Sequence, residues 1–264
     1  MTTLPALATL KVSWAASGVL LVTIDRAKSA NTITAQVCRD LEFLAKFTAA
    51  STDARALVIT GNGDRFFCAG ADLRDPEIGP GWIEQARRSY DAFANLPIPT
   101  IAAVNGLALG GGTELTLACD ARFSDPSAKF GLPEIKIGSL PGAGGMTRLQ
   151  HVVGPSVARD MVFTGRQVTA KEALAIGLTD RISMRGESVT EAVAYATDIA
   201  QFAGYAIRAA KRSLVNAIGN PTSSSLTFEY SQFDHMATSD ELAAEQRRAA
   251  DRDPVYARIF AARA

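Results

Sequence analysis

The chain has 264 residues, of which 47% are hydrophobic and 20% charged, so a packed core is expected and a disordered, collagen-like or coiled-coil protein is excluded. Lys and Arg number 27, as do Asp and Glu, so no overall positive field exists to hold a nucleic acid or an anionic membrane. The length allows one large domain or two modest ones.

The cysteines and the N-terminal segment bear on the compartment. Cys38, Cys68 and Cys119 are an odd number with no CxxC pair, which argues against a disulfide framework or a zinc site. The opening MTTLPALATLKVSW lacks the basic start and apolar stretch of a signal peptide. Prolines and glycines interrupt the longest uncharged stretch, 96–113, so it predicts no spanning helix. We therefore expect a cytoplasmic protein.

The first elements along the chain predict a layered fold. Short, β-branched segments at 9–13 and 18–25 are typical of a hairpin. Apolar residues from Val37 to Phe47 then recur every three or four positions, which indicates a helix. A buried strand is expected over 54–60. The order strand, helix, strand favours an α/β fold with a right-handed crossover.

The later elements divide the chain. A helix is predicted over 82–95, and a strand over 100–104 leads into a glycine cluster. From about residue 187 onward the periodicity is helical and no further strand is indicated. We therefore predict two regions, a mixed core over 1–203 and a helical region over 204–264.

Three glycine-containing stretches, 66–73, 105–120 and 130–145, differ from ordinary core or surface. In the second, Gly110-Gly111-Gly112 follows a strand and precedes a helix, and free N–H groups at a helix start bind negative charge. That charge can belong to a phosphate or to the oxyanion of a polarised carbonyl. The chain lacks GxxxxGK[ST] and GxGxxG, which favours the oxyanion.

Two glutamates accompany these glycines. Taken alone, Glu114 could be a carboxylate that complements the helix dipole, and Glu134 a solvated loop charge. Yet Leu132, Ile135 and Ile137 flank Glu134, so its segment is expected to be buried. Burial raises the pKa of a carboxyl group and lets it act as acid or base near neutral pH. Together the two could position a water and move its proton around an activated carbonyl compound.

These residues resemble the crotonase superfamily, the enoyl-CoA hydratase/isomerase family. The resemblance is carried by FCAGADL, PTIAAVNGLALGGGTELTLACD, AKFGLPEIKIGSLPGAGGMTRL and FTGRQVTAKEALAIGL, in that order. It implies an α/β fold, a crotonase-like spiral of repeated ββα units with a C-terminal helical oligomerisation region. It also implies a homotrimer or a dimer of trimers.

The resemblance implies an enoyl-CoA hydratase that adds water syn across the double bond of a trans-2-enoyl-CoA to give a 3-hydroxyacyl-CoA. The backbone N–H groups of Ala71 and Gly111 would hold the thioester oxygen. Glu114 would activate the water that attacks Cβ, and Glu134 would handle the proton delivered to Cα of the enolate. Coenzyme A enters as part of the substrate, and neither another cofactor nor a metal is implied.

The resemblance further implies a set of substrate-binding residues: Arg26, Lys28, Ala30, Ala69, Asp72, Leu73, Leu107, Gly110, Pro133 and Gly142. Ala27 replaces the proline that usually follows the arginine in this family, while the two basic residues remain and could meet the CoA phosphates. The segment 75–90 is expected to contribute a wall of the acyl pocket.

Several alternatives stay open. A Δ3,Δ2-enoyl-CoA isomerase, or another crotonase chemistry, is the main one, but isomerases often work with a single base, so two carboxylates favour hydration. A noncatalytic acyl-CoA-binding protein is less favoured because both acid–base residues are present. RNA binding would need a basic first helix, whereas acidic residues balance Arg39 and Lys46.

Overall fold

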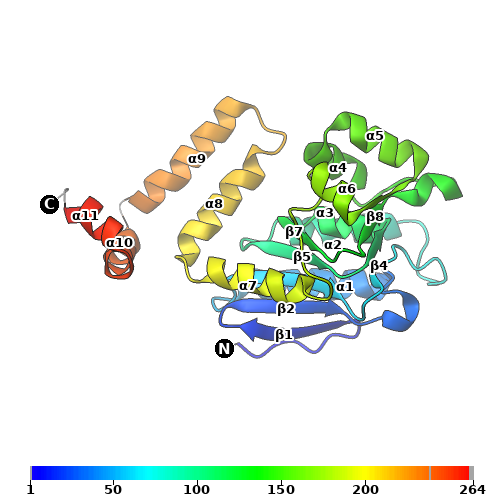
Figure 1. The fold of residues 1–264 in the computed structure, drawn as a ribbon, viewed down its shortest axis with the longest axis horizontal. Coiled ribbons are helices and arrows are strands. Elements are labelled where there is room, and N and C mark those ends of the chain that lie inside the picture. The colour runs from blue at the N-terminus through cyan, green and yellow to red at the C-terminus, as the bar shows by residue number, and fades with distance from the viewer. Residues whose placement is uncertain (1, 238, 262–264) are drawn as a thin grey trace. The chain divides into compact units, whose positions relative to one another are not determined.

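The computed structural model describes residues 2–237 and 239–261 (Figure 1). The chain divides into two compact units, Met1–Gln201 and Phe202–Ala264. The first unit contains every strand among the described residues, and the second unit is helical.

The larger sheet of the first unit has six strands in the order β1-β2-β3-β5-β7-β10. These are β1 (Leu10–Ala16), β2 (Val19–Ile24), β3 (Ala56–Gly61), β5 (Thr100–Val104), β7 (Ala121–Ser124) and β10 (Arg181–Ile182). β1 and β2 form the predicted antiparallel hairpin, in which Gly18 takes a φ of +76° at the turn. All other neighbours in this sheet are parallel.

The smaller sheet has four strands in the order β4-β6-β8-β9. They are β4 (Phe66–Cys68), β6 (Leu107–Leu109), β8 (Lys129–Gly131) and β9 (Gln167–Thr169). β3, β5 and β7 of the larger sheet are each followed along the chain by a strand of the smaller sheet and then by a helix. Those helices are α2 (Trp82–Ala94), α3 (Gly111–Leu117) and the 3-10 helix η2 (Pro133–Ile137). The chain thus repeats a strand–strand–helix unit.

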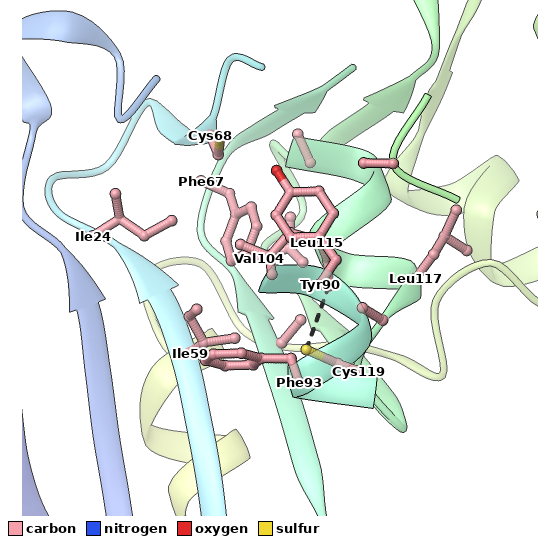
Figure 2. Close-up of a cluster of buried hydrophobic side chains, with 14 of the residues drawn as sticks. Ile24, Ile59, Phe67, Cys68, Tyr90, Phe93, Val104, Leu115, Leu117 and Cys119 are labelled. Atoms are coloured by element: carbon pink, nitrogen blue, oxygen red, sulfur yellow. Dashed lines mark hydrogen bonds between the residues drawn. The ribbon is translucent and has the colours of Figure 1, made fainter. Parts of the chain in front are cut away.

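Helices cover both faces of the larger sheet (Figure 1). α7 (Ser188–Ala200) packs on β2, β3, β5 and β7 through a small cluster that includes Phe123, Ala192 and Ala196. The main core, which includes residues of α1 (Ala35–Ala50) and α2, occupies the opposite side, and Figure 2 shows Phe67, Tyr90, Phe93 and Leu115 gathered within it. β3 is buried along its whole length because helices cover both of its faces.

Further helices complete the two units. The first unit also contains η1 (Ala27–Ser29), α4 (Gly145–Val153), α5 (Pro155–Thr164) and α6 (Ala170–Ala175). The second consists of α8 (Gly204–Ala217), α9 (Thr222–Ala237), α10 (Asp240–Arg252) and α11 (Pro254–Ala261). The second unit exposes large apolar side chains, among them Leu214, Leu226, Tyr230 and Phe233. In the described ranges no helix is long and apolar enough to cross a bilayer.

Candidate active site

The backbone after β4 leaves one N–H group without an acceptor. Ala71 forms an isolated parallel bridge with Ile33. The Ile33 N–H donates to the Gly70 carbonyl, and the Asp72 N–H donates to the Ile33 carbonyl, each at 2.8 Å. Because these bonds use the residues on either side of Ala71, its own N–H points away from Ile33. No described residue accepts a hydrogen bond from it.

A second free N–H lies next to the first. Gly111 begins α3, where the first N–H groups of a helix have no intrahelical partner. Gly70, with a φ of +91°, packs so closely here that a Cβ on it would lie 2.9 Å from the Leu109 carbonyl oxygen and 3.5 Å from Gly111 N. A Cβ on Gly111 would in turn lie 3.9 Å from Ala71 N. Two amide donors therefore come together, as an oxyanion site requires.

These amides open onto a cavity of about 600 Å³. Its lining includes Ala71, Gly111, Glu114 and Glu134 as well as a mostly apolar wall. The wall consists of Leu73, Ile78, Trp82, Ile83, Ala86, Tyr90, Ile137 and Leu140, together with residues of the glycine-rich loop before α4. Much of it comes from α2 and the segment that precedes it, as expected for 75–90. A cavity of this size and character suits an apolar group attached to a polar reacting centre.

Glu114 is fixed by the loop that leads into α4. The residue is 3% exposed, and its Oε1 accepts hydrogen bonds from Ala143 N and Gly145 N, both at 2.8 Å. A Cβ on Gly145 would lie 2.8 Å from Glu114 Cγ, so only glycine permits this approach. Burial raises the pKa of the carboxyl group, while the two amides and the Arg148 charge oppose that rise. With Oε1 occupied, Oε2 is the oxygen left to bind a water.

Glu134 lies in η2 and is half-buried. Its Oε2 is buried and finds no hydrogen-bond partner in the described part of the chain. A Cβ on Gly110 would lie 2.9 Å from its Oε1. Burial, opposed by a backbone amide and assisted by the nearby Glu114 charge, raises the pKa of Glu134 to about 7. The group can therefore give or take a proton near neutral pH.

Pairing of the smaller sheet brings the two glutamates to one site. β6 and β8 run parallel, and Gly110 N donates to the Gly131 carbonyl at 2.9 Å just beyond them. The chain leaves both strands at the same end, into α3 with Glu114 and into η2 with Glu134. Parallel strands place their exits together, so residues far apart in sequence share a cavity.

The residues predicted to bind substrate fall into two groups. Leu73 and Gly142 line the cavity, whereas the other eight do not. Arg26 Nη2 lies 3.0 Å from Asp72 Oδ2, and Arg26 Nε donates to the Thr32 carbonyl at 3.1 Å. The guanidinium of Arg26 therefore already has protein partners.

The remaining predicted residues are distributed over several elements of the first unit. Ala69 N donates to the Ala30 carbonyl at 3.1 Å. Lys28 is exposed in η1, and Leu107 begins β6. Gly110 is the N-cap of α3, which carries Glu114, and Pro133 begins η2, which carries Glu134.

Two features of the site were not predicted. The amides of Ala143 and Gly145 bind Glu114, whereas the sequence predicts only one residue of this loop, Gly142, to bind substrate. A glycine run before a helix was a usable signal, because it exposes N–H groups. Tyr90 lies in the segment 75–90, which is expected to form a wall of the pocket, but nothing in the sequence distinguishes its hydroxyl from that of an ordinary core position of a helix. Among the described residues no cluster of three or more His, Cys, Asp or Glu could hold a metal ion.

Comparison with known proteins identifies the family. The family model for enoyl-CoA hydratase/isomerase matches residues 15–256. The short-chain-enoyl-CoA hydratase of Clostridium acetobutylicum is 30% identical over 84% of this chain and 87% of its own. The human mitochondrial methylglutaconyl-CoA hydratase is 37% identical over 70% of this chain and 56% of its own.

Solved structures agree with this result. The crystal structure of enoyl-CoA hydratase from Bacillus anthracis has a TM-score of 0.87 at 31% identity and covers 93% of this chain and 96% of that chain. Pseudomonas aeruginosa DspI has a TM-score of 0.86 at 31% identity and covers 90% and 92%. The predicted crotonase-like α/β fold is confirmed, and the names of the relatives bear out the prediction of an enzyme of the hydratase kind. The chain belongs to the enoyl-CoA hydratase/isomerase family.

Proposed function

We propose that the protein is an enoyl-CoA hydratase that adds water syn across the double bond of a trans-2-enoyl-CoA. The observation that carries this proposal is the presence of two carboxyl groups, Glu114 and Glu134, in the cavity onto which the Ala71 and Gly111 amides open. Hydration needs a base for the water and an acid for the carbon, and two such groups supply both roles.

The amides of Ala71 and Gly111 bind the thioester oxygen. Attack on Cβ moves electrons onto that oxygen, so donors placed there in advance stabilise the transition state more than the substrate. Each such donor is worth about 3–4 kcal/mol. Their positions are set by the backbone and require no reorganisation during the reaction.

The glutamates then move protons in opposite directions. Water bound at Glu114 Oε2 gives a proton to that carboxylate as its oxygen bonds to Cβ. Glu134, which enters protonated, gives its proton to Cα as the enolate collapses. The product is a 3-hydroxyacyl-CoA, and one proton must return from Glu114 to Glu134 to restore the enzyme. The pKa of about 7 at Glu134 suits the acid of this pair.

Hydration of crotonyl-CoA tests the proposal directly. We expect the absorbance of the conjugated thioester to fall when purified protein is added, with 3-hydroxybutyryl-CoA as product. Turnover of a 3-enoyl-CoA with no hydration of crotonyl-CoA would refute the hydratase and identify an isomerase. Binding of crotonyl-CoA without any turnover would identify a noncatalytic acyl-CoA-binding protein.

Substitution of each carboxyl group separates their roles. We expect Glu134→Gln to lower turnover at least about 100-fold while acyl-CoA affinity changes little, because the amide has no proton to give. We expect Glu114→Gln to abolish hydration, since the attacking water then has no base to accept its proton. Full turnover in either variant would remove that residue from the mechanism.

The remaining proposals concern the rest of the substrate and the assembly. The reaction uses no cofactor beyond the CoA of the substrate, whose phosphates would lie near Arg26 and Lys28. The exposed apolar side chains of the second unit support a homotrimer or a dimer of trimers, which light scattering would test. Cys38, Cys68 and Cys119 are buried and form no disulfide, which suits a reducing compartment such as the cytoplasm.

A further inference from the structure

We propose that the hydroxyl group of Tyr90 is a third hydrogen-bond donor to the thioester oxygen, in addition to the amides of Ala71 and Gly111. This inference rests on the proposed function, because it concerns the same reacting oxygen. It makes Tyr90 a catalytic residue contributed by α2, an element that contains neither the amides nor the glutamates.

The position of the hydroxyl places it beside the amide donors. A Cβ on Gly111 would lie 3.0 Å from Tyr90 Oη and 3.9 Å from Ala71 N. The hydroxyl oxygen and the Ala71 amide therefore approach one point next to the Gly111 backbone. Tyr90 also lines the cavity. An acceptor atom bound by the two amides would thus occupy the space that the hydroxyl borders.

The ring is held firmly by the core. Tyr90 is 1% exposed, and it belongs to the same buried cluster as Phe67, Phe93 and Leu115. Figure 2 shows its ring beside α3, with the hydroxyl directed away from Phe93 and Cys119. A ring fixed on this many sides cannot turn its hydroxyl into solvent, so the donor is preorganised.

The hydroxyl has no partner of its own. No described residue forms a hydrogen bond with Tyr90 Oη. Tyr90 lines the cavity, so its hydroxyl can donate to an acceptor bound there, which a phenylalanine at this position could not do. Burial also raises the pKa of Tyr90 far above its ordinary value, so the phenol keeps its proton throughout the working pH range. A substrate oxygen is the acceptor that this unused donor fits.

Tyr90→Phe tests the proposal while preserving the ring. Loss of one donor to an oxyanion lowers kcat by about 100-fold, and we expect a fall of that order with KM changed less than about threefold. Tyr195→Phe is the matched control, because Tyr195 lies in α7 against Phe123 at a ring distance of 5.2 Å and outside the cavity lining. We expect it to keep wild-type kinetics.

A bound enolate gives a second readout that needs no turnover. Acetoacetyl-CoA forms an enolate whose charge resembles that of the reaction intermediate and which absorbs in the near ultraviolet. We expect the wild-type protein and Tyr195→Phe to increase the enolate fraction of the bound ligand, and Tyr90→Phe to increase it less. A lower kcat with an unchanged enolate fraction would assign the hydroxyl to the water or the proton and overturn the proposal, as would unchanged kcat.

The two readouts separate this inference from the proposed function. If the protein fails to hydrate crotonyl-CoA but stabilises the enolate in a Tyr90-dependent manner, the hydratase is refuted and the inference stands. If it hydrates crotonyl-CoA equally well with phenylalanine at position 90, the hydratase stands and the inference is refuted. Melting curves of the two phenylalanine variants establish that both are folded.

Discussion

Replacement of Glu134 by glutamine should stabilise the fold more at alkaline than at acidic pH. The pKa of Glu134 is raised, so the folded state favours the protonated carboxyl more than the unfolded chain does. The folded state therefore loses stability as pH rises from the ordinary pKa of 4.5 to about 7, and the loss is complete above that. Glutamine is neutral at every pH, so Glu134→Gln removes this dependence.

The size of the effect follows from the same pKa. A rise from 4.5 to about 7 corresponds, at 1.36 kcal/mol per pKa unit, to about 3 kcal/mol. Glu134 is only half-buried, and solvent screens part of its charge, so we expect about half of this, ~1.5 kcal/mol. For a chain of this length the melting temperature then changes by about 3–6 °C.

Melting temperatures of the wild-type protein and of Glu134→Gln, measured at pH 5 and pH 8, provide the test. The melting temperature of Glu134→Gln minus that of the wild-type protein should be about 3–6 °C larger at pH 8 than at pH 5. Titrations elsewhere in the chain cancel, because they occur in both proteins. Glu187→Gln is a control at an exposed glutamate. An equal difference at both pH values would refute the argument that Glu134 is a desolvated carboxyl group.

Three further predictions concern catalysis. For hydration, kcat/KM should fall about tenfold per pH unit above pH 7 because Glu134 must enter protonated, and a pH–rate profile that stays level to about pH 9 would contradict this role. Arg148→Met should move the acidic limb of the same pH–rate profile to higher pH, because the Arg148 charge lowers the pKa of Glu114. An acidic limb at the same pH in the variant would show that Arg148 does not influence the pKa of Glu114. Gly145→Ala should lower kcat by about 100-fold by displacing Glu114, whereas Gly79→Ala, where a Cβ meets no atom within 4 Å, should leave steady-state kinetics unchanged.

The two glutamates could be singled out from the sequence because each lies in a local pattern with its own physical meaning. Glu114 follows a glycine run at a helix start, and Glu134 sits among apolar residues between turns. Their shared cavity depends on the parallel pairing of β6 with β8, which joins residues about 20 positions apart. Local periodicity does not contain that pairing, and the family resemblance supplied it.

Other parts of the site depend on contacts that no local pattern reveals. Arg26 is expected to meet the CoA phosphates, and its guanidinium also binds Asp72, 46 positions later, a contact that no local pattern indicates. Glu114 is predicted to activate a water, but the sequence does not indicate that the amides of Ala143 and Gly145 hold its Oε1. Tyr90 occupies a helical core position, and only its distance from Gly111 distinguishes it from a packing residue.

The bridge between Ile33 and Ala71 has a consequence for how the enzyme could change. Two of the proposed donors to the thioester oxygen are peptide N–H groups, and a side-chain replacement at position 71 leaves the N–H of that residue in place. The proposed acid–base groups, Glu114 and Glu134, are side chains that single codon changes can replace. Evolution or design could therefore exchange the proton-transfer groups and so redirect the chemistry, while every descendant keeps the means to stabilise an enolate.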